Sequence, residues 1–229
     1  MKANETIDSF LNGKLQIIQS RQGYRFSVDA LLLAEFVSIR SNDVVVDLGA
    51  GCGIISLVLA VKRKLGFIVG LELQEELASQ AQRNIALNKL DKKIAIMRGD
   101  LRHLPIRPGF AHVVLCNPPY RRQKSGRINP DFSKAIARHE LSTKLDDILT
   151  AGKALLKPGG RLALIYPANR LTEIFAKMRI QEVEPKRLQI VFPNSYSNAK
   201  LAMIEGKLQG KSGIKILPPL FGQGQFSVV

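Results

Sequence analysis

A glycine-rich loop after a hydrophobic run is the first feature of this sequence that could do chemistry. The run Val44–Val46 leads into Asp47-Leu48-Gly49-Ala50-Gly51-Cys52-Gly53. Because glycine has no Cβ, such a loop lets the backbone approach a ligand closely at the carboxyl edge of a sheet. The spacing is G-x-G-x-G, which differs from the G-x-G-x-x-G of dinucleotide-binding loops, and an acid precedes it. The sequence therefore predicts a nucleotide-type site.

This pattern resembles the cofactor loop of Rossmann-like S-adenosylmethionine-dependent methyltransferases. The resemblance implies that the loop passes under the methionine part of the cofactor and that Asp47 helps to fix its ammonium group. Glu72 ends the next expected strand, where a carboxylate offers two acceptor oxygens to both ribose hydroxyls. Asp100 follows the third, where methyltransferases of this type bind the adenine amino group. The full set of expected cofactor contacts is Phe26, Ser27, Asp47, Gly49, Ala50, Gly51, Cys52, Gly53, Glu72, Leu73, Asp100, Leu101 and Asn117.

A plainer interpretation of these residues is an ordinary tight turn followed by solvated acids at strand ends. Each residue alone is weak support for a site. Three strand ends that carry the right residue types in the right order favour the cofactor site over the turn.

The tetrapeptide Asn117-Pro118-Pro119-Tyr120 ends the fourth expected strand and is the candidate catalytic motif. The prolines remove amide donors and restrict the backbone, which leaves the Asn117 side-chain oxygen and the Pro118 carbonyl as acceptors. Two convergent acceptors and an aromatic ring suit a planar amino group. Such a nitrogen is a poor nucleophile, so a catalyst must hold both N–H groups and favour a pyramidal nitrogen as positive charge develops. The alternative is a Pro-Pro turn that merely ends a strand.

A basic segment follows directly, with six cations and two acids between residues 121 and 140. Tyr120 is expected to stack on the target base, and the cations are expected to hold phosphates without reading sequence. A solvated basic surface is the alternative for any single cation. His139 is better explained as a capping or packing residue than as a substrate contact. The expected substrate-binding residues are Tyr120, Arg121, Arg122, Lys124, Arg127 and Arg138.

Four segments together resemble the bacterial tRNA1(Val) adenine-N6 methyltransferase family, and the resemblance extends from about Leu15 to Lys207. They are Tyr24–Ala34 (YRFSVDALLLA), Asn117–Tyr120 (NPPY), Gly126–Pro130 (GRINP) and Ala135–Glu140 (AIARHE). The resemblance implies methyl transfer from S-adenosylmethionine to N6 of the adenine just 3′ of the anticodon of tRNA-Val. It makes tRNA the expected partner.

Two other functions stay open at this point. Glutamine-N5 methylation of a protein such as a release factor would present a similar planar amide to the same tetrapeptide. A non-catalytic RNA-binding module on a decayed methyltransferase fold is the second, although the glycine loop, Glu72 and the tetrapeptide are all intact. The basic segment and the net charge favour RNA over protein.

The elements that must position these residues alternate between short β-branched runs and longer segments of helical period. The expected strands are Val44–Asp47, Phe67–Leu73, Ile94–Arg98, His112–Cys116, Arg161–Tyr166, Leu188–Phe192 and Leu201–Glu205. The expected helices are Val28–Val37 with Ser27 as its cap, Ile54–Lys64, Glu75–Asn88, Leu145–Leu156 and Thr172–Met178. We expect Lys157–Gly160 to stop a helix and Tyr120–Phe132 to be a surface loop.

These elements predict an α/β fold of the Rossmann-like class I methyltransferase type. Its seven-stranded, mostly parallel sheet has helices on both faces and ends in a C-terminal antiparallel hairpin. We expect one domain over residues 1–229, made of an N-terminal cap segment and helix (1–40), a core (41–207) and a C-terminal extension (208–229).

Composition narrows the class of protein further. The chain has 229 residues, 34 Lys+Arg against 19 Asp+Glu, and a formal net charge of +15, which favours a polyanionic partner. Its longest uncharged stretches, Leu48–Val61 and Ile216–Val229, fall well short of the roughly 20 residues that span a bilayer. The N-terminus is too polar for a signal peptide. Two cysteines without zinc-type spacing predict no metal site and a reducing, cytoplasmic location. The oligomeric state stays open.

Overall fold

A computed structural model describes residues 2, 4–21, 25–118 and 144–222 of the chain. Its centre is a nine-stranded sheet with the order β10-β8-β9-β7-β6-β3-β4-β5, in which β11 also pairs with β8. The strands are β3 (Val44–Leu48), β4 (Phe67–Glu72), β5 (Ile94–Arg98), β6 (Ala111–Cys116), β7 (Leu156–Pro167), β8 (Val183–Phe192), β9 (Leu201–Leu208), β10 (Lys215–Ile216) and β11 (Leu220–Phe221).

Pairing in this sheet is parallel except around β9, which runs antiparallel to both β7 and β8. All seven expected strands are therefore present, and β8 and β9 form the expected C-terminal antiparallel pair. The two-residue strands β10 and β11 extend the sheet beyond β8 in parallel orientation. Because β9 is antiparallel to both β7 and β8, β8 runs parallel to β7 and β6. The carboxyl ends of β3, β4, β5, β6, β7 and β8 therefore share one edge.

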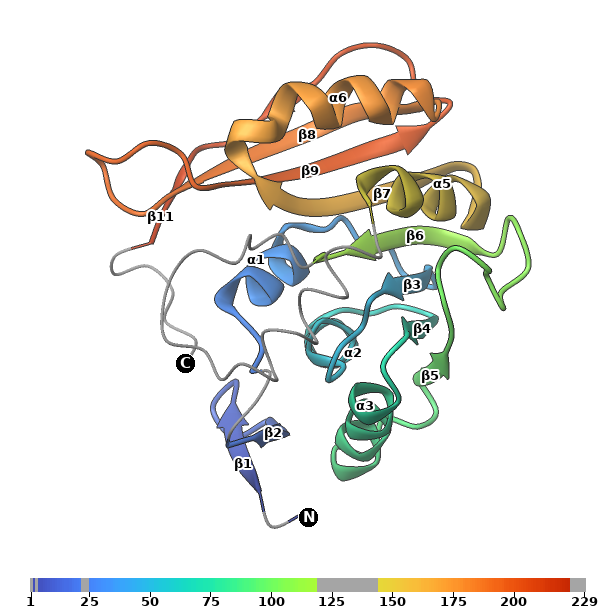
Figure 1. Ribbon diagram of the computed structural model, residues 1–229, viewed down its shortest axis with the longest axis vertical. Coiled ribbons are helices and arrows are strands. Elements are labelled where there is room, and N and C mark those ends of the chain that lie inside the picture. Colours follow the sequence, from blue (N-terminus) through green and yellow to red (C-terminus); the bar gives the residue numbers. More distant parts are fainter. Residues whose placement is uncertain (1, 3, 22–24, 119–143, 223–229) are drawn as a thin grey trace.

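Helices cover both faces of the sheet (Figure 1). The helices are α1 (Val28–Phe36), α2 (Ile54–Lys62), α3 (Glu75–Leu87), α5 (Leu145–Leu155) and α6 (Leu171–Ile180), with a short 3-10 turn, η1 (Ala168–Arg170). Successive strand residues point to opposite faces, so Val45 packs in the hydrophobic core under α1 and α2, whereas Val46 packs in the core under α5 and α6. The bounds of these five helices agree with expectation to within two residues at every end.

An N-terminal β-hairpin is the largest described feature that the sequence pattern did not predict. Strands β1 (Glu5–Phe10) and β2 (Leu15–Ser20) pair with each other and not with the main sheet. Leu15 and Ile17 of β2 are fully buried in the same core cluster as α1 and α2. The first 40 residues are thus a hairpin followed by a helix, and the hairpin is stable because one of its sides packs on the helical layer.

Two local expectations need correction. Ser27 occupies the N-cap position of α1 with an extended backbone, but its side chain makes no capping hydrogen bond. The turn at Lys157–Gly160 does not separate α5 from the fifth strand, because β7 begins at Leu156 directly after α5. Its pairing with β6 shifts register between Ala111 and Val113, and Gly159, with φ of +72°, sits in this irregular stretch.

Candidate functional site

The glycine loop lies at the carboxyl end of β3, directly against the end of the neighbouring strand β4. The backbone amides of Gly49 and Ala50 both donate to the carbonyl of Leu71, at 2.8 and 3.1 Å. Gly49, Gly51 and Gly53 all have positive φ, between +57° and +84°, a backbone region in which side chains with a Cβ are strained. The sequence-predicted loop is therefore a compact turn that places its backbone at the sheet edge.

Gly53 also makes room for a neighbouring helix. It caps α2 in a left-handed conformation, and a Cβ at this position would lie 3.3 Å from the Cβ of Ala81 in α3. The loop is held between β4 and α3 as a result, and its shape is set by tertiary packing as well as by its own glycines.

Asp47 is fully buried beneath this loop. Its Oδ2 accepts a hydrogen bond from the Ser56 hydroxyl at 2.9 Å, and its Oδ1 has no partner among the residues that the structure describes. Burial raises the pKa of Asp47 to about 7, the Ser56 hydrogen bond opposes this, and the negative charge of Glu72 adds to it. A buried carboxylate oxygen with no partner fits a cationic ligand group, such as an ammonium.

Glu72 ends β4 and ties the loop to the start of α3. One of its carboxylate oxygens accepts from the Gly51 amide at 2.8 Å, and the other accepts from the Gln74 amide at 2.9 Å. The residue is 5% exposed. Since each carboxylate oxygen has two lone pairs, both oxygens keep capacity for a further donor such as a ribose hydroxyl.

Asp100 follows β5 and meets a partner that the sequence pattern did not identify. Arg102 donates to it from Nη2 at 2.5 Å, from Nε at 3.0 Å and from its backbone amide at 2.9 Å. The Arg102 hydrogen bond lowers the pKa of Asp100, so this carboxylate is ionised at neutral pH. Gly99 donates to the Glu72 carbonyl at 3.0 Å, which brings this turn beside the end of β4.

The start of the tetrapeptide Asn117–Tyr120 lies on the same edge, one strand away from the glycine loop. Cys116, the last residue of β6, pairs with Leu48 at the end of β3. Asn117 is half-buried and Pro118 is buried. The structure thus brings Asp47, the glycine loop, Glu72 and Asn117 together at adjacent strand ends.

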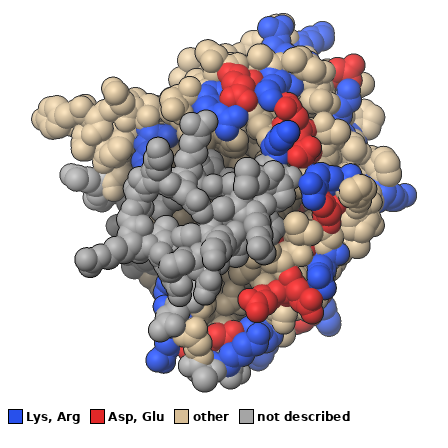
Figure 2. Space-filling model, in the orientation of Figure 1, with Lys and Arg blue, Asp and Glu red and all other residues tan. Residues whose placement is uncertain are grey.

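Several residues named in the sequence analysis lie outside the described residues. They are Pro119, Tyr120, Arg121, Arg122, Lys124, Arg127, Arg138 and His139, together with the expected surface loop 120–132. On the described surface of the face in Figure 2, basic and acidic side chains are interspersed.

The remaining expected cofactor contacts occupy varied positions. Phe26 is half-buried against the ring of Phe10 in β1, with ring centroids 5.1 Å apart. Leu73 is 37% exposed directly after Glu72, and Leu101 is half-buried against the core under α5. Burial raises the pKa of Cys52 to about 12, so its thiol is not a nucleophile at neutral pH.

Asn84 holds the glycine loop from α3, and the sequence pattern did not identify it. This fully buried side chain on α3 donates from Nδ2 to the carbonyl of Cys52 at 3.0 Å, and its Oδ1 accepts from the Ile18 amide at 2.7 Å. One helical turn later, Asn88 makes the same type of contacts to the backbone of Gln16. The sequence did contain a hint of these contacts, because two asparagines at positions i and i+4 of a helix lie on the same face.

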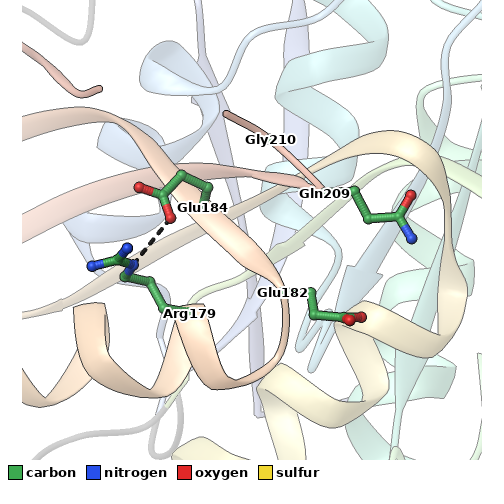
Figure 3. Close-up of a pocket in the computed structure, with 5 residues that line it drawn as sticks. All are labelled: Arg179, Glu182, Glu184, Gln209 and Gly210. Carbon is green, nitrogen blue, oxygen red and sulfur yellow. Dashed lines mark ion pairs between the residues drawn. The ribbon is translucent and has the colours of Figure 1, made fainter. Parts of the chain in front are cut away.

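A solvent-open hollow on another part of the surface does not belong to this site. Its lining residues come from the end of α6, the start of β8 and the segment after β9, and Figure 3 shows them: Arg179, Glu182, Glu184, Gln209 and Gly210. Arg179 and Glu184 form an ion pair across it at 3.1 Å. These elements meet at the amino edge of β8, opposite to the edge that carries the glycine loop.

In the described part of the chain, no helix is both long enough and apolar enough to cross a membrane.

The chain is similar to known methyltransferases in sequence and in structure. The family model described as "Methyltransferase small domain" matches residues 25–186. A tRNA1(Val) (adenine(37)-N6)-methyltransferase from Shewanella halifaxensis is 34% identical over 149 residues, which cover 64% of this chain and 59% of that protein. A protein with the same name from Parabacteroides distasonis is 26% identical over 193 residues, which cover 84% of this chain and 80% of that protein.

The matched region spans between 59% and 65% of the length of the first three curated relatives. Among solved structures, a predicted O-methyltransferase from Agrobacterium tumefaciens superposes with a TM-score of 0.67 at 20% identity, over 87% of this chain and 89% of that one. This likeness shows the class I methyltransferase fold.

Proposed function

This chain belongs to the methyltransferase small-domain family, and from that premise we propose that it transfers a methyl group from S-adenosylmethionine to N6 of an adenine in tRNA. The names of its curated relatives support the adenine next to the anticodon of tRNA-Val as the target. A tRNA substrate implies a cytoplasmic location. We propose one catalytic domain over residues 1–229.

The observation that carries this proposal is that the adjacent carboxyl ends of β6, β3, β4 and β5 bring together groups from four separate segments of the chain. The partnerless Oδ1 of Asp47 would accept from the cofactor ammonium, and the loop from Gly49 to Gly53 would lie along its methionine part. Glu72 would accept from the ribose hydroxyls, and Asp100 would accept from the adenine amino group. S-adenosylmethionine, when bound, supplies a methyl group made electrophilic by its sulfonium.

Asn117 and Pro118 would hold the amino group that receives the methyl. The Asn117 side-chain oxygen and the Pro118 carbonyl each accept one N–H, which favours a pyramidal nitrogen whose lone pair points at the methyl carbon. Transfer would form a C–N bond as the C–S bond of the donor breaks, and the positively charged nitrogen would then lose a proton to solvent. Because a methylated, positively charged nitrogen is strongly acidic, this step needs no potent general base.

The charge of the chain supports RNA over a protein substrate. A net charge of +15 suits a polyanion, and six cations lie between residues 121 and 140, directly after the tetrapeptide. We propose that Tyr120 stacks on the adenine and that Arg121, Arg122, Lys124, Arg127 and Arg138 contact phosphates.

One labelling experiment tests the proposal. Tritiated S-adenosylmethionine is incubated with the protein and bulk tRNA from a strain lacking it, and separately with purified release factors. Labelled N6-methyladenosine in tRNA is the expected product. Label in protein would instead show glutamine methylation, and no label in either would indicate a non-catalytic RNA-binding module. Asn117→Ala should abolish transfer while cofactor binding is kept, and retained activity of this variant would contradict the mechanism.

A further inference from the structure

We propose that the β8–β9 loop, residues 193–200, is a second contact surface for the RNA substrate, on which Tyr196 stacks against a base that flanks the target nucleotide. This inference rests on the proposed function and adds a substrate contact that lies outside the cofactor loop and the tetrapeptide.

The loop lies on the same edge of the sheet as the candidate catalytic residues. β8 runs parallel to β6, so Phe192 at the end of β8 and Asn117 after β6 lie at the same edge. Three strand spacings separate β6 from β8, about 14 Å, which is within reach of a few nucleotides of a bound strand. In Figure 1 the loop extends beyond the strand ends, and in Figure 2 it stands out as a projection of the surface.

Hydrogen bonds hold the loop at its base and at its tip. The Lys200 amide donates to the Val191 carbonyl at 2.9 Å, and the Ala168 amide donates to the Lys200 carbonyl at 3.1 Å. At the tip, Oδ1 of Asn194 accepts from the Tyr196 amide at 3.0 Å and from the Ser197 hydroxyl at 2.9 Å. A loop that is already ordered loses little conformational entropy when it binds a partner.

The adjoining C-terminal segment supports the start of the loop. Gly222 donates to the Phe192 carbonyl at 2.8 Å, and the rings of Phe192 and Phe221 lie 5.7 Å apart. Tyr196 is nevertheless 98% exposed, so this ordered loop presents an aromatic ring almost entirely to solvent.

An exposed aromatic ring and an exposed cation in the same loop suit a single-stranded nucleic acid. Lys200 is exposed and forms no ion pair with the residues that the structure describes, so its charge is available to a phosphate. Base stacking on an aromatic ring, combined with nearby positive charge, is the usual chemistry of single-stranded RNA binding. A single exposed apolar residue is common on protein surfaces, so the location at the catalytic edge is what distinguishes Tyr196.

The opposite edge of the sheet supplies matched controls. Ile180 at the end of α6 is 75% exposed, and Lys207 is an exposed lysine near the end of β9. Both lie at the amino edge of β8, since Lys207 pairs with Glu184. If an exposed apolar or basic residue anywhere on the molecule affected tRNA binding equally, these two positions would behave like Tyr196 and Lys200.

The test compares steady-state methylation of a tRNA transcript by the full-length wild type and the variants Tyr196→Ala, Tyr196→Phe, Ile180→Ala, Lys200→Ala and Lys207→Ala. Tyr196→Ala should raise the KM for tRNA by about tenfold, consistent with one lost stacking contact. Its kcat, its affinity for S-adenosylmethionine and its Tm should stay close to those of the wild type. Tyr196→Phe and Ile180→Ala should leave KM unchanged. Lys200→Ala should raise KM more at low salt than at high salt, and Lys207→Ala should not.

A KM for Tyr196→Ala within twofold of both the wild type and Ile180→Ala would overturn the inference, as would a loss confined to kcat. In either case an active wild type leaves the proposed function intact. A wild type that does not methylate tRNA would overturn the proposed function itself. If the wild type labels a release factor and Tyr196→Ala raises the KM for that protein, the loop binds a protein and the RNA assignment is wrong.

Discussion

The side-chain amide of Asn84 donates to the backbone carbonyl of Cys52 at 3.0 Å, while its oxygen accepts from the backbone amide of Ile18 at 2.7 Å. One buried side chain on α3 therefore joins the N-terminal hairpin to the glycine loop. Asn88, one turn further along the helix, contacts Gln16 of the same hairpin but not the loop. This difference separates a role in anchoring the hairpin from a role in positioning the loop.

The two asparagines should have different effects on cofactor binding. Asn84→Ala leaves the Ile18 amide without its acceptor and the Cys52 carbonyl without its donor, so we expect a several-degree fall in Tm and about tenfold weaker binding of S-adenosylmethionine. Asn88→Ala should lower Tm but keep the affinity within about twofold. Differential scanning fluorimetry and isothermal titration calorimetry measure the two quantities. Equal affinities for the two variants would show that Asn84 anchors the hairpin only.

Glu72→Gln should weaken cofactor binding through the loop as well as through the ribose. A glutamine amide has one acceptor oxygen where the carboxylate has two, so either the Gly51 or the Gln74 amide would face an NH₂ group. We expect an affinity loss of about 10- to 100-fold by calorimetry. The exposed neighbour Glu75, which pairs with Arg98, provides the control variant Glu75→Gln, whose affinity should be unchanged.

Cofactor affinity should rise with pH around neutrality because of Asp47. Its pKa in the free protein is raised to about 7, chiefly by burial, so the carboxylate form becomes more populated as pH rises through 7. A cationic ligand prefers this form, which predicts up to about tenfold tighter binding at pH 8 than at pH 6. Asp47→Asn should bind more weakly and with a flatter pH profile. A wild-type profile that is as flat as that of Asp47→Asn would contradict this prediction.

The raised pKa of Asp47 predicts the opposite trend for the stability of the ligand-free protein, which should fall as pH rises. The protonated Asp47 side chain contributes to the free energy of unfolding; this contribution is fully present below the unfolded pKa of 3.8 and is lost as pH rises through about 7. Thermal unfolding without ligand should therefore show that Asp47→Asn loses less stability than the wild type between pH 5 and pH 8. An identical fall in Tm for both proteins would show that Asp47 does not cause the loss of stability between pH 5 and pH 8.

The stability that the N-terminal hairpin contributes should fall in acid, because Glu5 loses its charge there. Arg83 makes two hydrogen bonds to this buried carboxylate, at 2.6 and 2.7 Å, and lowers the pKa of Glu5 to about 2. The stabilisation is present above the unfolded pKa of 4.5 and is lost as pH falls through about 2. We expect Glu5→Gln to cost roughly 1–3 kcal/mol of unfolding free energy at pH 7 and little at pH 2. Glu35→Gln, which removes an exposed ion pair with Lys62, should cost less than about 1 kcal/mol.

Much of the sheet could be predicted from local sequence. Runs such as Val44–Val46 are β-branched and apolar, and a buried parallel strand needs little else to be recognised. Asp47, Glu72 and Asp100 could be placed because parallel strands bring their carboxyl ends to one edge. The N-terminal hairpin could not be predicted in this way, because its stability comes from contacts with α3 that are distant in sequence, such as Arg83 on Glu5.

The partners of the predicted site residues were equally hidden from the sequence. Asp47 accepts a hydrogen bond from Ser56, and Asp100 accepts hydrogen bonds from Arg102. Nothing in the local sequence marks either donor, and the folded backbone directs each one at its carboxylate. The position of Tyr196 is a further example. It lies in a polar loop between two strands, and the parallel orientation of β8 relative to β6 and β7 is what places that loop at the edge that carries the glycine loop.

The sequence by itself determined which residues could do chemistry and which strands they follow, because glycine spacing, strand-end acids and the Asn-Pro-Pro-Tyr motif are local properties of the chain. Only the tertiary structure decided how these groups are held: an unpartnered oxygen on Asp47, a Glu72 carboxylate bound to two backbone amides, and an asparagine that joins the hairpin to the loop. Burial and most of these hydrogen bonds depend on neighbours from other segments, such as Gly51 at Glu72 and Ile18 at Asn84, and those neighbours come together only once the chain has folded.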